Sequence, residues 1–161
     1  MTKPVVGVSI QGIDAPDAVA QIRQAEAAGI AAAWATIGGA GGADVLTAFA
    51  VALEQTERIL LGTAIVQTYP RHAITMAQQT VALEQFGPGR FRLGIGPAHK
   101  GNMTASYGFG FEAPLTNLKE YLTVLRSLLH EGEVDFEGSQ VTARSRIRTP
   151  VQTPIMASAL R

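Results

Sequence analysis

The sequence predicts an α/β fold in which parallel strands alternate with helices. Three observations support this prediction: short apolar runs recur, an amphipathic segment follows each run, and the runs begin about every thirty residues, near positions 5, 31, 59 and 91. The chain of 161 residues is 47% hydrophobic and 16% charged, which provides a sizeable core and excludes intrinsic disorder. We therefore expect residues 1–161 to form one globular domain.

The first strand and the first helix form one βα unit. Val5–Ile10 is a nearly continuous β-branched run, which is typical of a strand buried on both faces. Asp14 then begins a helix as its N-cap, Pro16 lies in the first turn, and Gly29 ends the helix. A less regular apolar run, Ala31–Thr36, predicts the second strand.

A glycine-rich loop connects the second strand to the next helix. This loop spans Ile37–Gly42, and Asp44 after it has the residue type of an N-cap. The third strand, Ile59–Val66, is followed by a loop at Gln67–Arg71 and a helix at Ala73–Phe86. The helix that begins at Asp44 has an apolar inner face formed by Leu46, Phe49, Ala50 and Leu53.

The fourth strand precedes a long segment without periodicity. The run Gly87–Gly89 breaks the preceding helix, and Phe91–Gly96 forms the strand. Pro97–Leu115 is rich in glycine and aromatic residues and has no regular period, which is typical of a functional or mobile loop. Apolar residues at helical spacing then predict a helix over Leu118–Leu129.

A small hairpin and a fifth strand complete the predicted elements. The hairpin has strands at Val134–Phe136 and Gln140–Thr142, and the fifth strand is Pro154–Leu160. Two architectures agree with this order: an open doubly wound sheet, and the N-terminal part, about five βα units, of a (βα)8 TIM barrel with the hairpin inserted before strand five. The length favours the open sheet, but the sequence contains neither G-x-G-x-x-G after the first strand nor a P-loop motif.

Charge and composition exclude several classes of partner and site. Thirteen basic and thirteen acidic residues balance, and no basic run indicates binding to nucleic acid or to a membrane surface. The chain has no cysteine, and its three histidines lie far apart in the sequence, so we expect neither a disulfide nor a metal site. The N-terminus lacks the features of a secretion signal, and we expect a cytoplasmic protein.

The carboxyl ends of the predicted strands carry no hydrolytic machinery. In a barrel these ends form the active site, and here they hold neither a pair of carboxylates nor a Ser-His-Asp set at a recognisable spacing. They instead provide small, apolar and amide-bearing residues. Such a surface suits a planar ring, because a cofactor of that kind brings its own reactivity.

Three segments together resemble one protein family. They are Leu61–His72, reading LGTAIVQTYPRH, Ala77–Gln79, reading AQQ, and Gly89–Pro97, reading GRFRLGIGP. This pattern is similar to the bacterial luciferase-like superfamily, and within it to the deazaflavin-dependent oxidoreductases that use coenzyme F420. That family forms eight-stranded barrels, so the resemblance favours the barrel over the open sheet and implies that this chain provides strands one to five of eight.

The resemblance also implies where a cofactor binds. It implies a non-prolyl cis peptide at Ala64-Ile65 that supports the ring of the deazaflavin. His99 is the nearest titratable group, and it is either a proton donor or cofactor contact, or an ordinary loop histidine. The residues implied as ring contacts are Thr63, Ala64, Ile65, Gln67, Thr68, Gly96 and Pro97.

The expected function is hydride transfer between coenzyme F420 and a small organic substrate. A luciferase-type monooxygenase that uses FMN and molecular oxygen is the second alternative, because FMN and the deazaflavin share a ring outline. The third is a non-catalytic, truncated half-barrel, since a complete barrel needs about 250 residues and commonly binds phosphate after strands seven and eight. We therefore expect this chain alone to bind F420 weakly or not at all and to show no measurable turnover, and its unpaired sheet edges predict a homo-oligomer.

Overall fold

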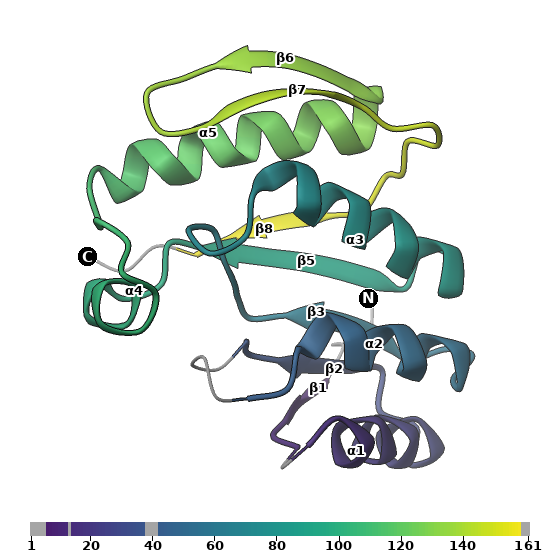
Figure 1. Cartoon of the computed structure of the whole chain (residues 1–161). Coiled ribbons are helices and arrows are strands. Elements are labelled where there is room, and N and C mark those ends of the chain that lie inside the picture. The colour runs from purple at the N-terminus through teal and green to yellow at the C-terminus, as the bar shows by residue number, and fades with distance from the viewer. Residues whose placement is uncertain (1–5, 13, 38–41, 159–161) are drawn as a thin grey trace.

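A parallel β-sheet forms the centre of the protein, and helices pack along it (Figure 1). The computed structural model describes residues 6–12, 14–37 and 42–158. The strand order is β1-β2-β3-β5, and both β4 and β8 pair with β5. The strands of this sheet are β1 (Gly7–Ile10), β2 (Ala32–Ala35), β3 (Leu60–Thr63), β4 (Val66–Gln67), β5 (Phe91–Gly96) and β8 (Ile155–Ala157).

Five α-helices are described, and all strand pairs of the sheet are parallel, which confirms the predicted alternation of strands and helices. The described part of the chain contains no helix that is both long and apolar enough to span a membrane. The helices are α1 (Ala15–Ala27), α2 (Val45–Glu54), α3 (Ala73–Phe86), α4 (Lys100–Tyr107) and α5 (Pro114–Arg126), and α5 continues into the π-helix η1 (Ser127–Glu131).

The predicted helix caps are present. Asp14 accepts a hydrogen bond from the Asp17 backbone N–H at 2.8 Å, and Asp44 accepts one from the Thr47 backbone N–H at 2.9 Å. Gly29 follows α1 with a φ of 78°, a conformation that glycine adopts without steric cost. Of the predicted glycine-rich loop, residues 38–41 lie outside the described residues.

The core lies between the sheet and the helices. Phe49 of α2 packs edge-on against Phe91 of β5, with ring centroids 6.4 Å apart, and Ile22 of α1 is fully buried. On the other face of the sheet, the half-buried Trp34 of β2 lies so close to Gly7 and Gly62 that a Cβ atom on either glycine would overlap the indole. The absence of side chains on these two glycines therefore makes room for the Trp34 indole on this face of the sheet.

Two predicted elements have different bounds in the structure. Pro97–Leu115 is not a continuous loop, because α4 lies within it; this helix has little amphipathic pattern and only Met103 is buried. The predicted strand Ile59–Val66 is divided into β3 and β4, since the chain leaves the sheet at Ala64 and Ile65. The fifth strand is also shorter, and residues 159–161 of the prediction lie outside the described residues.

The hairpin is confirmed with a shifted second strand. It consists of β6 (Glu133–Glu137) and β7 (Thr142–Arg146), and it lies over α5 in Figure 1. The turn is longer than predicted because the Glu120 carboxylate of α5 accepts hydrogen bonds from the backbone N–H groups of Ser139, Gln140 and Val141, and so removes them from the ladder. Burial acts to raise the pKa of Glu120, but these N–H donors outweigh it and lower the pKa.

Glu26 of α1 plays the same role at the start of β3. Its carboxylate accepts hydrogen bonds from the backbone N–H groups of Glu57, Arg58 and Ile59, at 3.0, 2.6 and 2.9 Å. Burial acts to raise the pKa of Glu26, but the three N–H donors and the charge of Arg58 outweigh it, so the pKa lies below its ordinary value.

Glu26→Gln is expected to lower the free energy of unfolding by about 1 kcal/mol at pH 7, a small value because solvent screens this carboxylate. A lowered native pKa gives stability that is present above the unfolded pKa and is lost as pH falls through the native pKa. The difference between wild type and variant should therefore shrink below about pH 4. Urea unfolding at pH 7 and in mild acid measures this, with the exposed Glu54→Gln as control; a difference independent of pH would contradict it.

Candidate functional site

The site begins where the chain leaves β3. The peptide bond between Ala64 and Ile65 is cis, as the resemblance implied. The Thr36 hydroxyl donates a hydrogen bond to the Ala64 carbonyl at 2.8 Å, and the Ile37 backbone N–H donates one to the Ile65 carbonyl at 3.4 Å. The residues after β2 therefore bind the backbone of the residues after β3.

A pocket of about 290 Å³ lies at the carboxyl ends of β2, β4 and β5. We call it the ring pocket. Six sequence-predicted site residues lie in its wall, and they come from two segments of the chain, residues 64–67 and 96–99, that the sheet brings together. The residues that line the ring pocket are Thr36, Ile37, Ala64, Ile65, Gln67, Gly96, Pro97, Ala98, His99, Asn102 and Ser158.

Gln67 lines the ring pocket and carries an unpaired polar atom. Its side chain is 6% exposed, and its Oε1 atom is buried without a hydrogen-bond partner. Leaving a buried acceptor without a donor costs about 1 to 3 kcal/mol, and a ligand that carries an N–H group removes that cost. A planar ring with a polar edge has the chemistry that this amide requires, so the residues present fit such a group.

Gly96 of β5 contributes only backbone atoms to the wall of the ring pocket. A Cβ atom on Gly96 would lie 2.7 Å from the Ser158 carbonyl oxygen and 3.3 Å from the Ile65 side chain. Only glycine permits this close approach of β5 to its neighbours. The wall formed by Gly96 and Ile65 is consequently small and apolar, and a flat ring can approach it closely.

His99 lies in the wall of the ring pocket at the N-terminus of α4. The preceding residue, Ala98, has a φ of 65°, and this left-handed turn leads the chain from β5 into the helix. His99 is exposed and forms no side-chain capping bond, so its imidazole is accessible to a molecule in the ring pocket.

Thr63 and Thr68 do not line the ring pocket, although they were predicted as ring contacts. The Thr63 hydroxyl donates to the Gly94 carbonyl at 2.8 Å and accepts from the Gly94 N–H at 2.9 Å, and so joins β3 to β5. The Thr68 hydroxyl donates to the Asn117 side-chain oxygen at 2.7 Å. In this structure both hydroxyls have structural partners.

Several residues of the wall were not among the predicted ring contacts. Thr36, Ile37 and Ser158 were predicted only as positions at the carboxyl ends of strands, and Asn102 lies in the unpredicted helix α4. The available signal was positional, since each of Thr36, Ile37 and Ser158 follows directly on a strand of a parallel sheet.

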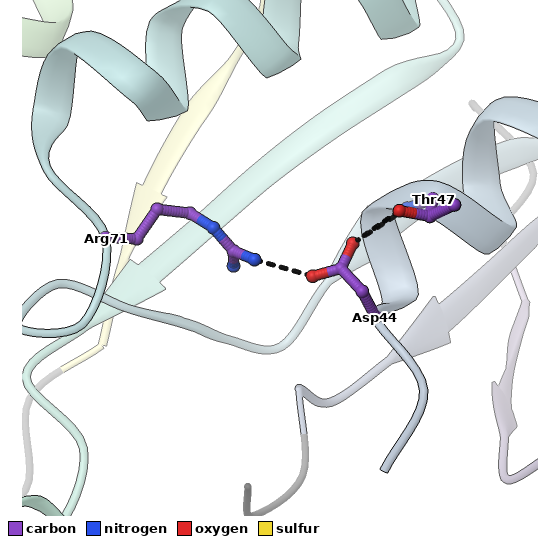
Figure 2. A network of polar contacts seen from close by, with 3 residues as sticks. All are labelled: Asp44, Thr47 and Arg71. Atoms are coloured by element: carbon purple, nitrogen blue, oxygen red, sulfur yellow. Dashed lines mark hydrogen bonds and ion pairs between the residues drawn. The ribbon is translucent and has the colours of Figure 1, made fainter. Parts of the chain in front are cut away.

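An ion pair lies beside this site (Figure 2). Arg71 contacts the Asp44 carboxylate at 2.5 Å, and the two side chains are only 21% and 34% exposed. Burial acts to raise the pKa of Asp44, but hydrogen bonds from Thr47 and the charge of Arg71 outweigh it and lower the pKa. Asp44 is therefore a carboxylate at neutral pH. It caps α2 and forms the ion pair with Arg71 at the same time.

Comparisons with known proteins give the family. The profile of the family described as luciferase-like monooxygenase matches residues 2–161. The chain belongs to the luciferase-like monooxygenase family. This luciferase-like chain is 32% identical over 98 residues to the 5,10-methylenetetrahydromethanopterin reductase of Methanolobus tindarius, covering 61% of this chain and 30% of that protein. It is 36% identical over 95 residues to the F420-dependent glucose-6-phosphate dehydrogenase of Intrasporangium calvum, covering 55% of this chain and 28% of that protein.

Solved structures show the same fold. The coenzyme F420-dependent tetrahydromethanopterin reductase of Methanopyrus kandleri has a TM-score of 0.83 at 24% identity, over 98% of this chain and 51% of that one. A type II Baeyer-Villiger monooxygenase of Pseudomonas putida, in complex with FMN, has a TM-score of 0.69 at 20% identity, over 78% of this chain and 37% of that one. The luciferase-like chain thus spans about half the length of the first structure, and less than a third of the two curated relatives.

These comparisons confirm two predictions. The α/β fold with a parallel sheet aligns with half of a luciferase-like barrel, and the sequence relatives include F420-dependent oxidoreductases.

Within the described ranges no group of three or more histidine, aspartate or glutamate residues is arranged to hold a metal ion.

Proposed function

We propose that the chain provides the ring-binding part of a site for hydride transfer between coenzyme F420 and a small organic substrate, with the deazaflavin ring in the ring pocket. The amide of Gln67 is the observation that carries the proposal, because Gln67 lines the ring pocket and its buried Oε1 atom has no hydrogen-bond partner. The relative named as an F420-dependent dehydrogenase supports the choice of cofactor. The lining suits a planar ring better than a flexible, charged ligand.

When bound, the deazaflavin supplies a ring carbon that gives or takes the hydride. The chain's own residues orient and shield that ring. Gln67 accepts a hydrogen bond at the polar edge, while Gly96 and Ile65 provide the flat wall and exclude water from it. His99 holds or delivers the one proton that a carbonyl or alcohol substrate requires, from the mouth of the pocket.

FMN-dependent oxygenation is the second candidate, because a fold relative was solved in complex with FMN. The wall of the ring pocket does not by itself separate the two rings, since FMN and the deazaflavin share an outline and both present a polar edge to Gln67. Parallel titrations with F420 and FMN decide between them. Tighter binding of FMN would favour the oxygenase.

Gln67→Leu is expected to weaken ring binding about tenfold, because it removes one buried hydrogen bond of about 1.4 kcal/mol at nearly constant volume. Titration of ring fluorescence up to millimolar cofactor measures the dissociation constant. The matched control is Gln78→Leu, since Gln78 is an exposed glutamine on α3. Equal affinity of wild type and Gln67→Leu for both rings would contradict the proposal.

We also propose that the chain forms a homo-oligomer. β1 and β8 lie at the two ends of the sheet, and the apolar residues Val6 and Met156 beside or within them are 63% and 38% exposed. Parallel sheets normally have both faces and edges covered, so these strands favour association. Light scattering at high micromolar concentration should show a dimer or larger species, and a monodisperse monomer would contradict this.

A further inference from the structure

The residues from Ala64 to His72, here called the ring-side segment, are held on one side by α5 and the loop before it. The Tyr121 hydroxyl of α5 donates a hydrogen bond to the Arg71 carbonyl at 2.8 Å. Burial raises the pKa of Tyr121, so this hydroxyl stays protonated and remains a donor. The Tyr69 hydroxyl donates to the carbonyl of Glu112 at 2.7 Å.

On the other side, the ring-side segment is attached to α2 through Arg71. Its guanidinium contacts Asp44 Oδ2, while Asp44 Oδ1 accepts from the backbone N–H and the hydroxyl of Thr47 (Figure 2). Both oxygens of the carboxylate are therefore used, which fixes its orientation toward Arg71. Because both side chains are about two-thirds or more buried, this pair should contribute more than an exposed surface pair does.

The residues after β2 add to this attachment. Thr36 and Ile37 bind the carbonyls of Ala64 and Ile65, so the ring-side segment contacts both Thr36 and Ile37 at the end of β2 and Asp44 at the start of α2. Arg71 itself is not in the wall of the ring pocket. Gln67, four residues earlier in the same segment, is in that wall.

We propose that Arg71 and Asp44 form a positioning pair that holds the ring-side segment against α2 and so keeps the Gln67 amide directed into the ring pocket. This inference rests on the proposed function. Without the pair, the segment keeps its hydrogen bonds to α5, to β5 and to the residues after β2, but Arg71 loses its attachment to α2. The Gln67 amide then has more than one orientation available, and a bound ring must select one of them, which weakens binding.

Three variants and one control test the pair. Arg71→Met removes the charge and keeps an unbranched side chain, Arg71→Lys keeps the charge, and Asp44→Asn keeps a capping oxygen for Thr47 while removing the charge. The control is Arg146→Met, which removes an exposed ion pair with Glu133 on the hairpin. Two quantities are measured on the full chain: hydrogen exchange of backbone amides without ligand, and the dissociation constants for F420 and FMN.

Arg71→Met and Asp44→Asn should each accelerate exchange in the ring-side segment and weaken ring binding, both by about tenfold, the change that corresponds to ~1.4 kcal/mol. Arg71→Lys should stay within about threefold of wild type, and Arg146→Met should match wild type. Exchange that rises equally in the hairpin would mean general destabilisation and would overturn the inference.

Unchanged ring affinity in Arg71→Met and Asp44→Asn would overturn the positioning role while leaving the proposed function intact. Failure of the wild-type chain to bind either ring at millimolar concentration would instead remove the proposed function, and the role toward a ring with it. The exchange measurement needs no ligand, so it shows separately whether the pair holds the ring-side segment at all.

Discussion

Gly94→Ala should destabilise the protein by more than about 3 kcal/mol, or prevent folding, because it forces strand β5 away from strand β3. An ideal Cβ atom at Gly94 would overlap the carbonyl oxygen of Thr63. The obstacle is backbone, and the Thr63 hydroxyl binds both the N–H and the carbonyl of Gly94, so no flexible side chain can move aside. A loss of this size is a large fraction of the 5–15 kcal/mol that typically stabilises a domain.

Denaturant unfolding followed through Trp34, the single tryptophan of the chain, measures this effect. Gly101→Ala is the matched control, because Gly101 lies in α4 and a Cβ atom there meets nothing within 4 Å. That control should be neutral or stabilising by up to about 1 kcal/mol, as alanine is the better helix former. A Gly94→Ala protein as stable as the control would contradict the close packing of β3 and β5.

Local signals were sufficient to predict most of the fold. Asp14 and Asp44 were recognised as N-caps from residue type and position alone, and both accept the expected backbone hydrogen bonds. The helix Ala73–Phe86 and the strand Phe91–Gly96 have the predicted bounds, because the Gly-Pro-Gly turn between them permits neither element to continue. Helix caps and turns of this kind depend on residues that are neighbours in the sequence, so they can be predicted from one sequence alone.

Features that depend on distant residues were not predicted from pattern. The turn of the hairpin is set by Glu120, about twenty residues earlier, and α4 is a short helix whose sequence has almost no apolar periodicity. The run Ile59–Val66 is apolar except for Thr63 and predicts one continuous strand, and only the resemblance implied a cis peptide at Ala64-Ile65, where β3 and β4 are divided.

The candidate site also combines features that local motifs predict with features that depend on distant residues. Ala64, Gln67 and Gly96 were identified from motifs and line the ring pocket, but the unpaired state of the Gln67 amide is visible only when its surroundings are known. The pairing of Arg71 with Asp44 joins residues 27 positions apart, and neither motif nor spacing indicates it. Thr68 has the residue type of a ligand, yet its hydroxyl is already bonded to Asn117.

The chain of 161 residues should bind F420 more weakly than micromolar and show no measurable turnover. Among the described residues, the wall of the ring pocket contains no lysine or arginine, and His99 is its one titratable side chain. A charged cofactor tail is normally held by charge-assisted hydrogen bonds of about 1.5 to 3 kcal/mol each, and every ~1.4 kcal/mol corresponds to a factor of ten in affinity. The absence of two such bonds alone reduces affinity by about two orders of magnitude or more.

The test compares F420, FMN and a deazaflavin ring without a charged tail, each titrated against the purified chain by ring fluorescence. If the contacts are confined to the ring, the tail-free deazaflavin should bind within about threefold of F420, and raising the salt concentration should change neither constant appreciably. Micromolar or tighter binding of F420, lost at high salt, would instead mean that this chain or its oligomer supplies a tail anchor. In that case a non-catalytic half-barrel would no longer be an alternative, and turnover with candidate alcohols and carbonyl compounds would be the next measurement.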